Sequence, residues 1–404
     1  MLPTTPTPTR RRHKTRTRWR LAAPLVALAL LLVPTARADD AANPLDRNGP
    51  GGNPAQQAAA PEWVVPGARI TDAFMFASGP KEVRPNQAPG TAGTGFTQYD
   101  IVAVTPDGVV IQARSYMAYE PGRPVELSGT HIALTDHATG GGLWMQPTVI
   151  AATQPTDSDP NATITKEPIE INGETYEAIH FVNKSGNTTI RRVYDIRTGI
   201  RLAESNLTED AQNRNHESAQ YAGYRVAQLP WIGTEFTEQI QGLNKLIYEG
   251  AMVFVSPPTP GIERMPDMEM DFEAEFAFAV ASPQLIAVNL TFDIDMPEGP
   301  NQTNERQEPI CPGQRMGLYI HPDVLIRLED GQVLDEDPTI GYRIVVTDVY
   351  QVQGVTLVEI TEQGRGNSYH NKATYDASVG LQVAAEWTQP AMSQRIESQL
   401  ERVE

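Results

Sequence analysis

The sequence predicts an all-β protein of two tandem homologous domains, each a curved antiparallel sheet forming an open half-barrel with few short helices. Two observations predict this class. After Trp63, short stretches rich in Val, Ile, Tyr, Phe and Thr alternate with Gly, Pro, Asn and Asp, which is typical of antiparallel strands joined by turns. Several short motifs also recur later in the chain in the same order, which indicates an internal duplication.

The first 38 residues have the three parts of a secretory signal peptide. A basic stretch, residues 10–20, precedes an apolar run of 13 residues, 21–33. At about 1.5 Å per residue that run is too short to cross a hydrocarbon core of about 30 Å. Ala36 and Ala38 then form an A-x-A cleavage pattern. We expect a secreted or periplasmic protein of a bacterial envelope, with no transmembrane segment after cleavage.

The exported chain is strongly acidic. The leader holds eight of the 32 Lys and Arg and none of the 50 Asp and Glu, so its removal leaves a formal charge of −26. Nucleic acids bind proteins through Lys and Arg that neutralise phosphates, so no nucleic-acid partner is expected. Solubility is one explanation of this acidity, and binding of a cation or a basic ligand is the other.

The chain has a single cysteine, Cys311, so an intramolecular disulfide is excluded and the exported fold must be held by packing. Cys311 lies between two prolines, Pro309 and Pro312. We interpret it as a buried, inert thiol rather than a nucleophile.

Composition divides the mature chain into segments. Residues 39–61 are rich in Ala, Pro, Gly, Asn and Gln and predict a disordered linker. The first β domain is expected over 62–230, the second over 231–390, and a C-terminal helix or tail over 391–404. Apolar residues three or four apart also predict a helix within 233–246.

Four motifs recur at nearly constant offset. Residues 143–150 return at 318–325, 194–203 at 375–384, 73–78 at 251–256, and 102–106 at 279–283, with offsets of 175, 181, 178 and 177 positions. Short helical turns are expected after Pro147 and Pro322, since proline is favoured at a helix start.

The second motif predicts a turn with defined chemistry. Tyr-Asp is followed by a glycine, Gly199 in the first copy and Gly380 in the second. The Asp side chain can cap the turn, and the glycine supplies a positive φ.

This motif, Tyr-Asp-x-x-x-Gly-(Ile/Leu)-x-(Leu/Val)-Ala, resembles that of the periplasmic lipoprotein carriers of the LolA and LppX type. The resemblance covers about ten residues in each copy and implies a curved half-barrel with an apolar cavity for acyl chains. The tandem arrangement and the lack of a long helix in each copy depart from the family.

Residues 267–276 alternate carboxylates with apolar side chains, which predicts a strand with one face of each kind. Its carboxylates are candidates for a cation site or a basic partner surface, and a solvated outer face is the alternative: Asp267, Glu269, Asp271 and Glu273. Large apolar residues of this strand and of the repeated Leu-(Trp/Tyr)-(Met/Ile)-x-Pro motif are candidates to line a ligand cavity, or simply core anchors: Trp144, Met145, Tyr319, Ile320, Phe272 and Phe276.

No recognised catalytic or phosphate-binding signature is present. We therefore expect a non-enzymatic exported binding protein with no cofactor, which takes a lipid or another apolar small molecule. One alternative is a structural or interaction module that meets other envelope proteins. Another is a carboxylate-dependent hydrolase, which requires His321, Asp323 and His370 to converge in one cleft.

Overall fold

The computed structural model describes residues 59–81, 90–118, 124–159, 161–255, 267–296, 300–389 and 394–404. All of them belong to one compact unit, residues 55–404. The predicted signal peptide and most of the predicted linker lie outside the described residues.

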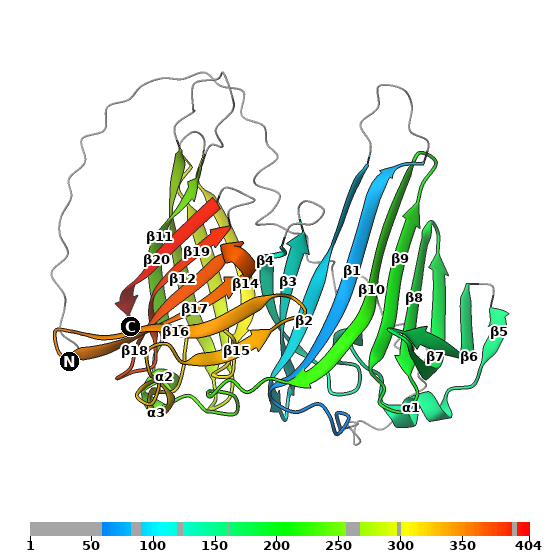
Figure 1. The fold of residues 1–404 in the computed structure, drawn as a ribbon, viewed down its shortest axis with the longest axis horizontal. Coiled ribbons are helices and arrows are strands. Elements are labelled where there is room, and N and C mark those ends of the chain that lie inside the picture. Colours follow the sequence, from blue (N-terminus) through cyan, green and yellow to red (C-terminus); the bar gives the residue numbers. More distant parts are fainter. Residues whose placement is uncertain are drawn as a thin grey trace. The chain divides into compact units, whose positions relative to one another are not determined.

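The first copy forms a ten-stranded antiparallel sheet in the order β4-β3-β2-β1-β10-β9-β8-β7-β6-β5 (Figure 1). Its strands are β1 (Ala68–Pro80), β2 (Thr91–Thr105), β3 (Gly108–Ala118), β4 (Glu126–Thr135), β5 (Thr156–Asp159), β6 (Ala162–Ile171), β7 (Glu174–Ser185), β8 (Thr188–Asp195), β9 (Arg201–Glu209) and β10 (Asn213–Val226).

The second copy forms another ten-stranded antiparallel sheet, in the order β14-β13-β12-β11-β20-β19-β18-β17-β16-β15. Its strands are β11 (Lys245–Phe254), β12 (Met268–Ala281), β13 (Ile286–Ile294), β14 (Gln302–Ile310), β15 (Val333–Asp337), β16 (Tyr342–Val352), β17 (Val355–Gly364), β18 (His370–Asp376), β19 (Gln382–Gln389) and β20 (Gln394–Val403).

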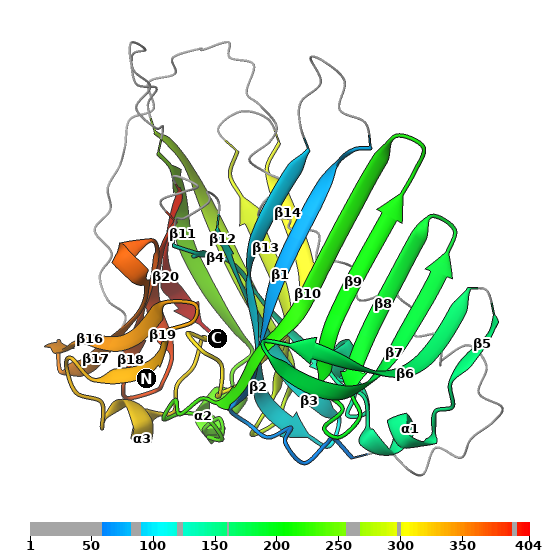
Figure 2. The same ribbon diagram turned by 45° about the vertical axis from the view of Figure 1, so that its right-hand side comes forward.

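The two sheets have the same topology, strand for strand. In each, four strands run outward as a meander, the chain crosses to the far edge, and six strands return until the last pairs with the first. The edge strands do not pair with each other, so each sheet stays open, and both are visibly curved and twisted (Figure 2). The predicted all-β fold with two curved, open antiparallel sheets is confirmed.

Helices are few and short. The connections to the far edges contain α1 (Pro147–Ala152) and α3 (Pro322–Leu325), each beginning at the proline that predicts it. The others are α2 (Glu238–Gln241) and the 3₁₀ turns η1 (Gly140–Gly142) and η2 (Arg365–Asn367). Among the described residues, none of the helices is long and apolar enough to cross a membrane.

Both longer helices expected from the sequence are wrong. Within 233–246 only the single turn of α2 forms, and Lys245 already begins β11. At the C-terminus, residues 394–403 form β20, which pairs with β11 and β19. Ile396 and Leu400 are four apart, which fits the period of a helix and equally the period of two of a strand. Pairing with two neighbouring strands selects the strand.

The repeated motifs contact each other in both copies. An isolated bridge joins Trp144 to Ile200 in the first copy and Tyr319 to Leu381 in the second. The glycine carbonyl of each turn accepts a backbone hydrogen bond, Gly199 from Met145 and Gly380 from Ile320, each at 2.9 Å. In each copy, therefore, the segment that begins the short helix is hydrogen-bonded to the glycine turn. This contact explains why both motifs recur.

The register of the sheets corrects one predicted repeat. The register shifts between Thr71 and Asp72 on β1 and between Ile247 and Tyr248 on β11. Aligning these two shifts gives an offset of 176 between β1 and β11, in place of the predicted 178. A shift of two residues keeps every side chain on the same face. The bulges on β2 and β12, at Ile101/Ala103 and Phe278/Val280, confirm the predicted offset of 177.

The largest core cluster joins the two copies. Tyr116 and Leu127 of the first sheet are buried together with Tyr342, Ile344 and Ile360 of the second. The connecting residue Trp231 is fully buried in the same cluster and donates from Nε1 to the Gln314 carbonyl at 2.9 Å.

Candidate functional site

A set of charged and polar side chains, all buried except the partly exposed Arg225, connects the two sheets. It contains four guanidinium groups and four carboxylates, from Arg69, Arg114, Arg225, Arg315, Asp100, Asp335, Asp337 and Glu362. We call this set the charged contact.

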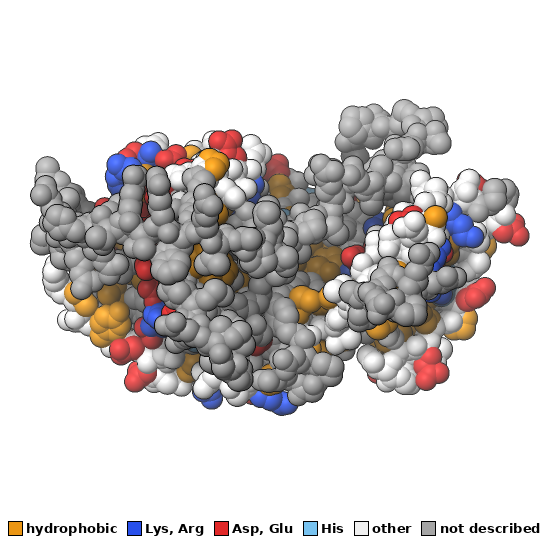
Figure 3. Space-filling view, turned by 90° about the horizontal axis from the view of Figure 1, so that it is seen from above, with side chains coloured by type: hydrophobic (Ala, Val, Ile, Leu, Met, Phe, Trp, Pro, Cys, Tyr) orange, Lys and Arg blue, Asp and Glu red, His pale blue; other side chains and the backbone are white. Residues whose placement is uncertain are grey.

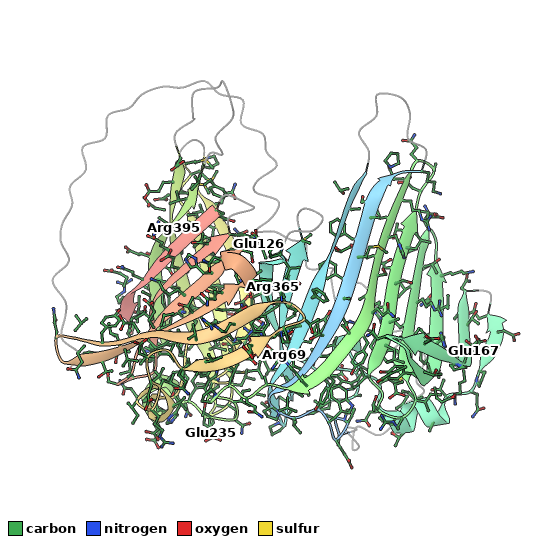
Figure 4. All side chains as sticks on the ribbon, viewed as in Figure 1. Arg69, Glu126, Glu167, Glu235, Arg365 and Arg395 are labelled. Atoms are coloured by element: carbon green, nitrogen blue, oxygen red, sulfur yellow. The ribbon has the colours of Figure 1, made fainter. Side chains whose placement is uncertain are left out.

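Arg69 connects β1 to the second sheet (Figure 4). Within its own sheet its Nε and Nη2 donate to Asp100, the latter at 3.2 Å. Its Nη1 lies 2.6 Å from Oδ2 of Asp335 on β15 and donates to the Tyr342 hydroxyl. Arg225, beside Arg69 on β10, donates to both oxygens of Asp335 at 2.8 and 3.1 Å. Asp335 of the second sheet therefore accepts hydrogen bonds from two arginines of the first sheet.

Glu362 on β17 is the second junction. Its Oε2 accepts from Nη2 of Arg114 at 2.5 Å, and its Oε1 accepts from the hydroxyls of Tyr116 and Tyr369 at 3.0 and 2.9 Å. All of its acceptor oxygens are thus engaged away from water, as a buried carboxylate requires.

Arg315 fills the space between these junctions. Its guanidinium lies 4.7 Å from the ring centroid of Tyr342 and donates from Nη1 to Gln98 at 3.0 Å. Its backbone N–H donates to Oε1 of Gln112 at 2.8 Å. The rings of Tyr116 and Tyr342 stack nearly parallel, with centroids 5.8 Å apart. Side chains of both copies therefore complete one hydrogen-bonded network.

The arginines keep the buried carboxylates ionised. Burial by itself would raise the pKa of Asp335, but hydrogen bonding by Arg225 and the charge of Arg69 lower it to about 2. Burial likewise opposes ionisation of Glu362, yet Arg114 and Arg315 hold its pKa below the ordinary value. Arg69 and Arg315 have the same effect on the pKa of Asp100. Carboxylates held this way are suited to joining two sheets, not to proton transfer at neutral pH.

The two sheets differ on the face that carries Asp72 of β1 in the first copy and the equivalent Tyr248 of β11 in the second. In the first sheet, cross-strand partners Arg192 and Glu204 form an ion pair at 2.9 Å. Glu204 also pairs with Arg201, whose Nη2 lies 2.7 Å from Asp72. A chain of alternating charges thus lies across β8, β9 and β1.

In the second sheet the same positions are uncharged. The bulges at Val193/Tyr194 and Thr374/Tyr375 set the correspondence, so Ala373 and Ala385 replace Arg192 and Glu204. The register shifts after Thr71 on β1 and after Ile247 on β11 place Tyr248 where the first copy has Asp72. The duplicated sheets therefore differ at these positions, which are charged in the first copy and neutral in the second.

Apolar side chains surround these neutral positions on β11, β12, β13 and β20. They are the apolar face of the second sheet: Phe254, Met268, Phe272, Phe276, Phe292 and Ile396. Phe272 and Phe292 are in contact, with centroids 4.9 Å apart. Met268 is 44% exposed. In the view of Figure 3, hydrophobic side chains appear in small groups beside acidic ones.

The six predicted cavity residues fall into two groups. Trp144, Met145, Tyr319 and Ile320 are buried in the core next to the repeated turns. Phe272 and Phe276 lie on the apolar face of the second sheet, Phe276 half-buried. None of the six lines the recess of about 350 Å³ beside Tyr342 or the recess of about 520 Å³ over the first sheet. Their role in ligand binding stays a prediction.

The predicted carboxylate strand is confirmed as β12. Glu269, Asp271 and Glu273 are exposed on it, while Met270 and Phe272 are buried. Asp267 lies just before it. Among the described residues, no group of three His, Cys, Asp or Glu side chains could hold a metal ion. A cation site on these carboxylates stays a prediction.

Of the three residues of the hydrolase alternative, His321 and Asp323 contact each other, and His370 contacts a different carboxylate. His321 caps α3 and accepts from the Asp323 backbone N–H at 3.2 Å. His370 on β18 lies 3.1 Å from Glu386. No hydrogen bond or ion pair within the described ranges joins His370 to His321 or Asp323, which gives the hydrolase alternative no support.

Sequence reasoning missed the charged contact because most of its members occupy ordinary alternating strand positions and Arg315 lies in a turn between β14 and α3. One signal was available for the charge chain of the first sheet. At the predicted offset of 181, Arg192 and Glu204 stand opposite Ala373 and Ala385. Charges present in only one of two homologous copies mark the face on which the copies differ.

Comparison with known proteins names no family. No protein-family model and no curated protein match the sequence. A solved structure of MucB in complex with MucA(peri) is 10% identical, covering 83% of this chain and 88% of that chain, with a TM-score of 0.21. The MucA/MucB complex of Pseudomonas aeruginosa is 12% identical, covering 82% and 89%, with a TM-score of 0.19.

Proposed function

We propose that this chain is an exported, non-enzymatic binding protein that holds a lipophilic ligand against the apolar face of its second sheet. One observation carries the proposal: half-buried aromatic and Met side chains form a continuous surface on this face. Beside it the second sheet has the neutral Tyr248, Ala373 and Ala385, at positions where the first sheet has the ion-paired Asp72, Arg192 and Glu204. The export leader, residues 1–38, supports an envelope location.

Physical chemistry favours an apolar occupant there. Each Å² of apolar surface removed from water contributes about 25 cal/mol, so covering a few half-exposed aromatic rings is worth several kcal/mol. Phe254 and Met268 are cross-strand partners, and so are Phe276 and Leu290, which makes the apolar surface continuous over three strands. The charged contact contributes by joining the two sheets through groups that are not available to a ligand.

The first test uses N-phenyl-1-naphthylamine, a neutral probe whose fluorescence rises in apolar surroundings. We expect saturable binding to the full mature chain. Met268→Glu should weaken it about tenfold, because a bound apolar molecule would have to desolvate the new carboxylate. Met268 is partly exposed, so the variant should fold.

The matched control is Glu269→Gln, one residue along β12 on the opposite face, which should bind the probe like the parent chain. Absence of saturable binding, or equal affinity in Met268→Glu, would refute the proposal. Mass spectrometry of lipid that co-purifies with the mature chain then identifies the natural ligand.

A further inference from the structure

The first sheet contains a surface recess of about 520 Å³ that none of the preceding roles uses. It lies over β1, β8, β9 and β10. Its apolar wall includes Met75, which is 49% exposed, together with Val193 and Ala203. Its polar lining includes Arg191 and the hydroxyls of Ser205 and Ser218.

Among the described residues that line this recess, Arg191 is the one Lys or Arg. Its Nη2 lies 2.9 Å from Nδ1 of His180, and Nε2 of His180 lies 2.9 Å from the Glu167 carbonyl. A guanidinium can only donate and a carbonyl can only accept, so these partners assign the neutral tautomer of His180 with its proton on Nε2. Arg191 is thus oriented by a neutral group.

In the second copy, the cation at the position of Arg191 is neutralised by carboxylates. The equivalent of Arg191 is Lys372, because Arg191 faces Ser205 and Lys372 faces Glu386 in the same register. Lys372 lies 3.4 Å from Glu359 and 3.5 Å from Glu386. Two carboxylates of the chain therefore neutralise the cation in the second copy.

Both carboxylates are missing from the first copy. His180 stands where the second copy has Glu359, and Ser205 where it has Glu386. Among the residues that the structure describes, no ion pair involves Arg191, although the mature chain carries more than twice as many acidic as basic residues. Glu204 also lines the recess, but both of its oxygens are held by Arg192 and Arg201.

We propose that this recess binds a small organic carboxylate, whose anionic group takes the place of the two missing side-chain carboxylates. A guanidinium matches a planar carboxylate with two parallel hydrogen bonds. Ser205 and Ser218, in the same cross-strand row as Arg191, are placed to donate further ones. Met75, whose side chain is half exposed, receives the apolar part of the molecule.

The single cation favours a monocarboxylate over a phosphate, which carries more charge. This site does not rest on the proposed function, because it lies on the other sheet.

The test is isothermal titration calorimetry of the mature chain with sodium hexanoate, with hexan-1-ol as the matched uncharged molecule. One equivalent of hexanoate should bind, and hexan-1-ol should bind much more weakly. Arg191→Gln should weaken hexanoate binding at least about tenfold, the usual effect of losing a charged hydrogen bond. Ser205→Glu, which restores the second copy's carboxylate opposite Arg191, should have the same effect while preserving the fold.

Two variants separate this site from the rest of the molecule. Lys372→Gln, the matched change in the second sheet, should leave hexanoate binding unaltered, and so should Met268→Glu on the apolar face. No binding by the parent chain, or unchanged affinity in both Arg191→Gln and Ser205→Glu, would overturn the proposal. Loss of binding in Met268→Glu but not in Arg191→Gln would overturn it too, because the anion would then occupy the apolar face.

Discussion

Nη2 of Arg114 on β3 lies 2.5 Å from Oε2 of Glu362 on β17, although the two residues are 248 positions apart in the sequence. Both side chains are buried almost completely. Breaking a buried ion pair leaves an uncompensated charge, which costs far more than the loss of an exposed pair. The charged contact therefore makes the two duplicated sheets dependent on each other.

Glu362→Gln should lower the free energy of unfolding by about 3–5 kcal/mol, because Arg114 would lose its carboxylate partner in a buried site. Urea unfolding followed by circular dichroism measures the change. The matched control is Glu397→Gln, which removes an exposed partner of Arg395 and should cost less than about 1 kcal/mol. Equal costs for the two variants would contradict a special role of the charged contact.

Acid should weaken the contact at Asp335. Its folded-state pKa, about 2, lies below the ordinary value of 3.8. The stabilisation by its ionised form is therefore complete above about pH 4 and is lost as the pH falls toward 2. This loss is on the order of 1 to 2 kcal/mol. Urea unfolding midpoints measured at several pH values test this. Asp335→Asn should be less stable than the parent at neutral pH, and its stability should fall less steeply in acid. An equally steep fall in the variant would contradict the assignment to Asp335.

The fold could be predicted because its determinants are local or repeated. Pro147 and Pro322 begin their short helices, and the Tyr-Asp-Gly motifs give turns, since each depends on a few neighbouring residues. The C-terminal strand could not be distinguished from a helix, because Ile396 and Leu400 fit both periods. Its conformation depends on pairing with β11, which is distant in the sequence.

The candidate site was predictable only in part. Alternation along β12 correctly separated Phe272 from Glu273 and so identified one strand of the apolar face. Arg69 and Arg191 occupy similar alternating positions, yet one is buried between the sheets and the other lines a recess. Which neighbours face each arginine depends on the register of several strands, and single-strand patterns do not contain this information.

Gly199→Ala should be strongly destabilising. Gly199 has φ of 76°, and an added Cβ would lie 1.9 Å from the Met145 carbonyl oxygen. The matched control is Gly354→Ala, where φ is 86° but no described atom lies within 4 Å of the new Cβ. The control should cost only the backbone strain, about 1–2 kcal/mol. Similar thermal midpoints for the two variants would show that the turn does not pack tightly against the Met145 segment.

The rate at which Cys311 is chemically modified should show whether the contact between the two copies is closed. Its side chain is fully buried in a cluster with Val102, Val110 and Ile132 of the first sheet. Burial raises the pKa of the thiol above its ordinary value, and the thiolate is the reactive form. We expect a disulfide reagent to modify the native chain at least about a hundredfold more slowly than the chain in denaturing guanidinium chloride.

The same thiol tests whether the charged contact keeps the copies together. If Arg114 and Glu362 resist separation of the sheets, Glu362→Gln should speed the modification of Cys311 under native conditions, while Glu397→Gln should not. Opening would expose Cys311 because the cluster around it consists mainly of first-sheet residues. A native rate equal to that of the denatured chain would show that the thiol is not enclosed. A rate unchanged by Glu362→Gln would show that the apolar cluster holds the copies without this ion pair.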